Sequence, residues 1–115
     1  LSSWKAASEG AVDRSGELVQ LLGSVGRSRA YGSFWAACML AEGAVDTVVD
    51  ASLSFYEVAA LLPLIREAGG VASTLEGDLP EHAGVSVTGV RPVSLVASNT
   101  AAVQQQVLEA LAPRP

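Results

Sequence analysis

Hydrophobic residues along this chain recur with two spacings, one typical of amphipathic helices and the other typical of buried strands. The helical spacing is clearest over residues 54–68, where four apolar residues follow an i, i+3, i+4, i+7 pattern and predict one core-facing stripe. These residues are Val58, Leu61, Leu62 and Ile65. Similar patterns predict helices over residues 13–22 and 33–40, and a last helix that Asn99 or Thr100 can cap.

Short runs rich in β-branched and other apolar residues separate these helices and predict strands. The predicted strands cover residues 27–31, 45–49, 71–74 and 93–97. Segment 76–92 contains glycines and prolines and predicts a turn and a surface loop. Because helices lie between successive strands, the pattern predicts an α/β fold with a largely parallel sheet flanked by helices. A length of 115 residues fits a single domain over residues 1–115.

The predicted sheet also indicates where a ligand would bind. In parallel α/β sheets, ligands lie beyond the carboxyl ends of the strands and near helix N-termini. Three junctions of this kind carry polar residues, namely Gly32–Ser33, residues 50–57 and Ser98–Asn99. These junctions are therefore the candidate functional loops.

Charge and composition argue against two classes of partner. The net charge is −5 and the basic residues include one lysine, so no nucleic-acid partner is expected. No apolar run is long enough to span a bilayer, and the N-terminus lacks a signal-peptide pattern, so no membrane partner is expected either. The single Cys38 cannot form an internal disulfide and suits a reducing compartment, so we expect a cytoplasmic protein.

Four short motifs follow one another in the central part of the chain. They are RAYGSFW at residues 29–35, AEGAVD at 41–46, SFYEVAAL at 54–61 and IREAGG at 65–70. In this order they resemble the C-terminal half of the inositol monophosphatase family, and especially its histidinol-phosphate phosphatase-like branch. The resemblance extends over about residues 13–111. It implies the later half of a layered α-β-α-β-α fold, with an N-terminal metal-binding half that is absent from these residues.

The resemblance also implies an activity. The family hydrolyses small phosphate monoesters, with water activated by clustered Mg²⁺ ions. Its other metal ligands come from a Glu-Glu segment and an Asp-Pro-Leu/Ile-Asp-Gly-Thr loop, and neither occurs in this chain. Mg²⁺ needs several oxygen ligands that converge on one point. We therefore expect this chain to be inactive without an N-terminal half, and to act on histidinol phosphate or inositol phosphate when joined to it.

Glu57 is the expected metal ligand. It stands where the family has an aspartate that binds a catalytic metal, within a Trp-Asp pair that is Tyr56-Glu57 here. Glutamate keeps the oxygen ligand that Mg²⁺ prefers, but its extra methylene moves the carboxylate. The residues alone offer a second role, because Ser54 and Glu57 have the spacing of a helix capping box. Both roles remain open from the sequence.

The expected substrate-binding residues are Asp50, Gly32 and Ser33. The resemblance places Asp50 where an acidic residue accepts hydrogen bonds from substrate hydroxyl or amine groups, and Gly32–Ser33 where the substrate pocket is bordered. The alternatives are a turn aspartate that faces water and a serine that only caps a helix. The histidinol-phosphate phosphatase-like branch often has aspartate at the position of Ser33. The neighbouring Phe34 and Trp35 are expected in the core or in a pocket wall.

Two functions from different classes follow from this reading. The first is part of a Mg²⁺-dependent phosphomonoesterase, with a small phosphorylated metabolite, the N-terminal half of the fold and a second copy of the chain in a homodimer as partners. The alternative is a non-catalytic, degenerate phosphatase module for dimerisation or ligand binding, in which Glu57 is only a cap. No Ser-His-Asp or Cys-His arrangement competes with these, because the chain contains one histidine.

Overall fold

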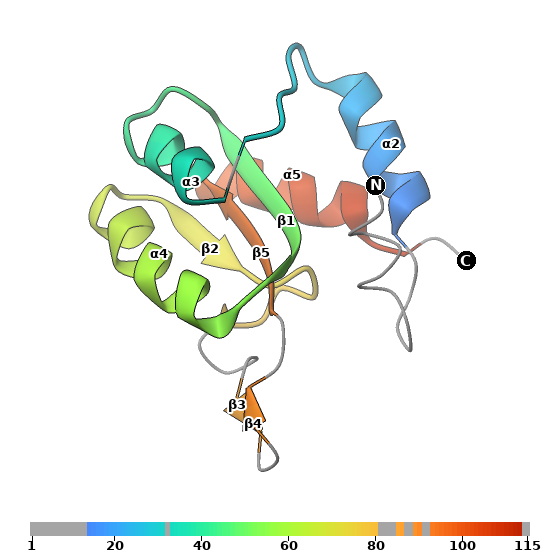
Figure 1. The fold of residues 1–115 in the computed structure, drawn as a ribbon. Coiled ribbons are helices and arrows are strands. Elements are labelled where there is room, and N and C mark those ends of the chain that lie inside the picture. The colour runs from blue at the N-terminus through green and yellow to red at the C-terminus, as the bar shows by residue number, and fades with distance from the viewer. Residues whose placement is uncertain (1–13, 32, 81–84, 87–88, 91–92, 114–115) are drawn as a thin grey trace.

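The computed structural model describes residues 14–31, 33–80, 85–86, 89–90 and 93–113 (Figure 1). Its helices are α2 (Ser15–Ser24), α3 (Ser33–Ala41), α4 (Phe55–Glu67) and α5 (Ala101–Leu111). Its strands are β1 (Thr47–Leu53), β2 (Val71–Ser73), β3 (Val85–Ser86), β4 (Gly89–Val90) and β5 (Val93–Ser98). The four predicted helices are confirmed within two residues at their ends. In the described part of the chain, no helix is both long and apolar enough to cross a membrane.

The predicted strands are confirmed with one exception. Residues 71–74 and 93–97 correspond to β2 and β5, while β1 starts at Thr47 and continues four residues beyond the predicted end at Val49. The strand predicted at residues 27–31 is wrong, because these residues form no strand and are exposed. None of the strands in the described residues pairs with segment 27–31, and a strand requires such a partner for its backbone hydrogen bonds.

The main sheet is antiparallel, so the predicted largely parallel sheet is wrong. Its strand order is β1-β5-β2, and β5 pairs antiparallel with both neighbours. Helix α4 connects β1 to β2, which run in the same direction but are separated by β5 (Figure 1). Among the described residues between β2 and β5 there is no α-helix. The prediction took strands joined by a helix to be neighbours in the sheet. Instead, β5 lies between β1 and β2, which are the two strands that run in the same direction.

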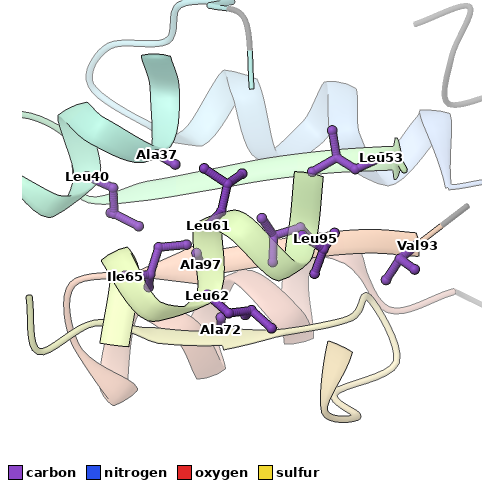
Figure 2. Close-up of a cluster of buried hydrophobic side chains, with 11 residues drawn as sticks. Ala37, Leu40, Leu53, Leu61, Leu62, Ile65, Ala72, Val93, Leu95 and Ala97 are labelled. Carbon is purple, nitrogen blue, oxygen red and sulfur yellow. The ribbon is translucent and has the colours of Figure 1, made fainter. Parts of the chain in front are cut away.

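Helices cover both faces of this sheet and bury two hydrophobic clusters. The larger cluster lies between the sheet and the pair α3 and α4, and Figure 2 shows its side chains converging from those helices and the three strands. The smaller cluster lies on the opposite face, against α2 and α5. Along β5, Leu95 and Ala97 belong to the first cluster and Val96 belongs to the second. The central strand is therefore buried on both faces.

Helix α4 shows how local sequence sets the limits of an element. Its apolar stripe is buried as predicted, and Ser54 caps its first turn. Gly69 follows its end with a φ of 87°, a conformation that costs glycine little. Gly70 then passes close to β5, where a Cβ atom would lie 3.1 Å from the Ser98 carbonyl oxygen. Pro63 is accommodated on the exposed side of the helix.

A buried hydrogen-bond network connects α5 to the sheet. Gln104 Nε2 donates to Ser73 Oγ of β2 and to the Val96 carbonyl of β5, both at 2.9 Å. Gln104 Oε1 accepts from Ser98 Oγ at 2.7 Å, and Thr47 Oγ1 of β1 lies 2.9 Å from the same Ser98 Oγ. The network reaches all three strands. No buried side-chain nitrogen or oxygen among the described residues lacks a partner.

Truncating Gln104 should destabilise the fold strongly. Gln104→Ala removes one hydrogen-bond partner each from the hydroxyls of Ser73 and Ser98 and from the buried Val96 carbonyl, and we expect a loss of about 2–4 kcal/mol in unfolding free energy. Gln106→Ala, at an exposed position of the same helix, is the matched control. It should change the unfolding free energy by less than about 0.5 kcal/mol. Urea denaturation measures both, and equal effects would contradict the structural role of the network.

Candidate functional site

The predicted site residues lie around the end of β1 and the starts of α3 and α4. Asp50 lies in β1, Glu57 lies in the first turn of α4, and Ser33 is the first residue of α3. Gly32 lies outside the described residues. Helices α3 and α4 cover the same face of the sheet, and α4 begins where β1 ends (Figure 1).

The third candidate loop, Ser98–Asn99, is not part of this group. Ser98 pairs with Thr47 at the beginning of β1, and Asn99 donates a hydrogen bond of 2.7 Å to the Val45 carbonyl. This candidate loop therefore lies apart from the other two. The reason is that β5 runs antiparallel to β1. The carboxyl end of β5 therefore lies beside the start of β1, at the other end of the strands from Leu53.

An irregularity in β1 accompanies Asp50. Asp50 pairs with Leu95 and Leu53 pairs with Val93, so three residue steps in β1 match two in β5. Extra residues of this kind form bulges, which bend a strand and redirect its side chains. Here the backbone N–H of Ser52 donates to Asp50 Oδ1 at 3.2 Å. The half-buried carboxylate is thus oriented by its own strand.

The electrostatic environment of Asp50 disfavours its ionised form. Burial raises the pKa of the Asp50 carboxyl above its usual value, and the negative charge of Glu57 raises it further. The hydrogen bond from the Ser52 backbone lowers the pKa and opposes these two effects only in part. A cation or a substrate ammonium group near both carboxylates would relieve their repulsion. The arrangement therefore suits a positively charged partner.

Glu57 forms the capping box that the sequence offered as its second role. The backbone N–H of Glu57 donates to Ser54 Oγ at 3.2 Å, and the backbone N–H of Ser54 donates to Glu57 Oε2 at 3.3 Å. The Glu57 side chain is exposed, and its Oε1 has no hydrogen-bond or ion-pair partner among the described residues. The cap therefore engages one carboxylate oxygen and leaves the other free to meet a ligand.

The described residues do not form a complete metal site. They contain no group of three His, Cys, Asp or Glu side chains that could hold a metal ion. Asp50 and Glu57 provide carboxylate oxygens, which are the ligand type that Mg²⁺ prefers, but too few to surround it. The donor chemistry therefore fits Mg²⁺, and the number of donors does not suffice without further polypeptide.

Aromatic side chains near this site are more exposed than the sequence suggested. Phe34 and Trp35 are 68% and 64% exposed, so of the two expected places the core is excluded and the pocket wall stays a prediction. Ala37 and Leu40 face the core from α3 instead. Trp35 precedes them by two and five positions, which places it on the opposite side of the helix. The spacing of Trp35 from Ala37 and Leu40 is present in the sequence. It indicates exposure only once Ala37 and Leu40 are known to face the core.

An open hollow of about 540 Å³ lies elsewhere in the molecule. It is bordered by the start of α2, the end of α5 and the turn after β2. Arg14 lines it and donates to the carbonyl oxygens of Leu75 and Leu111, at 3.2 and 3.3 Å. Neither Asp50 nor Glu57 lines this hollow.

Two relatives of this chain are named histidinol-phosphatases. It is 42% identical over 69 residues to the protein of Mycobacterium tuberculosis, which covers 60% of this chain and 26% of that protein. It is 38% identical over 84 residues to the protein of Streptomyces coelicolor, which covers 73% of this chain and 30% of that protein. The chain thus corresponds to less than a third of the length of either relative.

Solved structures show the same fold. A protein from Pyrococcus horikoshii, described as similar to inositol-1 monophosphatase, superposes with a TM-score of 0.67 at 27% identity, over 83% of this chain and 38% of that one. The inositol monophosphate-bound SaIMPase-II superposes with a TM-score of 0.67 at 21% identity, over 83% and 35% of the two chains. At that identity the second likeness concerns the fold alone.

The sequence profile of the inositol monophosphatase family matches residues 3–114, which is nearly the whole chain. The expected resemblance is confirmed by this match, and the two histidinol-phosphatase relatives support the expected branch. The chain belongs to the inositol monophosphatase family.

Proposed function

We propose that this chain is the substrate-side part of a Mg²⁺-dependent phosphatase that hydrolyses small phosphate monoesters of the histidinol phosphate or inositol phosphate type. The observation that carries the proposal is the pair of carboxylates at the junction of β1 and α4, where Asp50 is half-buried beside the charge of Glu57. The names of the two bacterial relatives favour histidinol phosphate as the first substrate to test.

In this proposal the remaining metal ligands come from polypeptide outside this chain. Glu57 would hold Mg²⁺ through the carboxylate oxygen that the capping box leaves free. When bound, Mg²⁺ would polarise the phosphoryl group and lower the pKa of the attacking water. The capping box holds the backbone of the first turn of α4, so it would also position the Glu57 carboxylate that binds the metal.

Asp50 would bind the part of the substrate that carries hydrogen-bond donors. A hydroxyl group or an ammonium group can donate to its carboxylate, and the ammonium group also offsets the repulsion from Glu57. Ser33 begins α3, and the unpaired backbone N–H groups of a helix N-terminus attract anions. With Gly32, it would border the pocket that receives the phosphorylated substrate.

A homodimer in the reducing cytoplasm completes the proposal. The single cysteine of the chain is compatible with such a compartment. The second candidate is a non-catalytic module, and one observation favours it. Glu57 already has a structural role in the cap, and the described residues lack a three-ligand group.

The test of the proposal is phosphate release by the intact natural polypeptide that contains this chain. We expect hydrolysis of histidinol phosphate in the presence of Mg²⁺ and its loss after chelation with EDTA, with inositol monophosphate as the second substrate. Absence of hydrolysis of both substrates at saturating Mg²⁺ would favour the non-catalytic module. Hydrolysis that persists in EDTA would contradict the role of the metal.

Two substitutions separate the ligand role of Glu57 from its capping role. Glu57→Gln keeps an oxygen for the Ser54 N–H but removes the charge. Because changes in the outer shell of a metal site alone cost about 10- to 100-fold in affinity or activity, we expect the Mg²⁺ concentration for half-maximal activity to rise more than about tenfold. Ser54→Ala removes the cap and keeps the carboxylate. It should cost about 1 kcal/mol of stability.

The comparison of these two variants decides between the roles. Mg²⁺ titration of the activity and thermal unfolding are measured on both proteins. A normal Mg²⁺ requirement in Glu57→Gln would leave Glu57 with the capping role alone.

Asp50→Asn should change the pH dependence of stability. The raised pKa means that the folded state binds a proton more tightly than the unfolded state, whose pKa is near 3.8. Ionised Asp50 therefore lowers stability as the pH rises through the window from about 3.8 to the raised pKa, and the loss persists at neutral pH. We expect Asp50→Asn to have a higher melting temperature than the wild type at pH 7 without Mg²⁺. At pH 3 this advantage should disappear. An equal difference in melting temperature at pH 3 and pH 7 would refute the raised pKa of Asp50.

A further inference from the structure

The aromatic residues of this chain have an unusual distribution. The sequence contains six, and Trp4 lies outside the described residues. Of the other five, only Phe55 packs against the core. The remaining four are 42–75% exposed, and each lies at the start of α3 or α4, namely Tyr31, Phe34, Trp35 and Tyr56. Exposed aromatic residues therefore gather at the helix N-termini that also carry the candidate site.

Three of them lie within a stretch of five residues at the start of α3, and we call these three the aromatic patch: Tyr31, Phe34 and Trp35. Phe34 and Trp35 belong to the first turn of α3, and Tyr31 precedes the helix by two residues. The rings of Tyr31 and Trp35 are in contact, with centroids 5.6 Å apart and planes inclined at 35°. Helix α3 reaches the core through Ala37 and Leu40 instead. The packing of α3 within this chain therefore does not require the aromatic patch.

The chemistry around the aromatic patch selects among ligands. Tyr31 and Phe34 flank Gly32–Ser33, which we propose as the border of the substrate pocket. Aromatic faces attract flat rings and cations, whereas a polyol is recognised by hydrogen bonds. The paired carboxylates Asp50 and Glu57 add negative charge at the neighbouring junction. A ring that carries or can acquire a positive charge satisfies both features, and imidazole is such a ring.

We propose that the aromatic patch is the specificity-determining surface that holds the imidazole ring of the substrate, while the phosphate is processed at the metal site. This inference rests on the proposed phosphatase function and deepens it. Phe34 and Trp35, the more exposed members, supply the ring faces. Tyr31 supports Trp35 through the contact between their rings.

The first test compares two substrates in the intact natural polypeptide. Phe34→Leu and Trp35→Leu keep apolar volume but remove the ring, and each should lower kcat/KM for histidinol phosphate about five- to tenfold. The same variants should change kcat/KM for glycerol 2-phosphate, which has no ring, less than about twofold. Trp35→Phe keeps an aromatic face and should restore most of the loss. Leu22→Ala, at an exposed position on α2 across the sheet, is the control and should alter neither substrate.

Equal losses on the two substrates would overturn the proposal. That result would mean that the aromatic patch packs against another polypeptide segment and supports the site as a whole. Because the ratio of the two kcat/KM values is compared within each variant, a partly unfolded preparation does not imitate selectivity.

The second test is independent of catalysis and of Mg²⁺. In the intact polypeptide, every tryptophan except Trp35 is changed to phenylalanine, Trp4 included, and L-histidinol is titrated while fluorescence is recorded. We expect a saturable change in the Trp35 emission with histidinol and none with glycerol, and the response should be absent in a matched Phe34→Leu protein. No response to histidinol would overturn the proposal.

The two tests also separate this inference from the function on which it rests. If the wild-type polypeptide hydrolyses neither substrate, the proposed phosphatase function fails, whereas a saturable Trp35 response would still support ring binding. If it hydrolyses both substrates and the Leu variants show no selectivity, the function stands and the role of the aromatic patch fails.

Discussion

The structure depends on one central strand, β5, which is paired on both edges and buried on both faces. Its antiparallel pairing with β1 and β2 satisfies its backbone, and its side chains alternate between the two hydrophobic clusters. Gln104 connects this strand to α5 and to β2 through buried hydrogen bonds. Unpaired polar groups would be costly in such a place. The four helices of the described residues are thus positioned, directly or through a cluster, by β5.

This arrangement explains why the candidate site lies at the edge of the sheet. Strand β1 pairs with β5 on one side, and its irregular pairing between Asp50 and Leu53 leads directly into the cap of α4. The longer side chain of glutamate allows Glu57 to reach the Ser54 backbone, which is what a capping box requires. In the proposed function, Glu57 therefore both stabilises the start of α4 and binds the metal. The cap holds the helix start, while the remaining carboxylate oxygen and Asp50 give the junction its negative charge.

Much of the fold could be predicted from the sequence, and the errors have a common physical origin. The helices and the Ser54–Glu57 box were correct because a helix and its cap depend on residues within about one turn. The parallel sheet and the strand at residues 27–31 were wrong because pairing depends on partners far apart in the chain. For the site, the motifs indicated Asp50 and Glu57. Phe34 and Trp35 were placed in the core or in a pocket wall, and only the packing of α3 on the sheet excluded the core.

The sequence by itself determined the family, the positions of the helices and the identity of the polar residues at their starts. These features are local, because motifs, helical periodicity and caps are contained in short segments. Only the tertiary structure decided the place of β5 between β1 and β2, the raised pKa of Asp50 and the outward position of the aromatic patch. Each of these depends on burial or pairing between segments separated by many residues. That information exists only after the chain has folded.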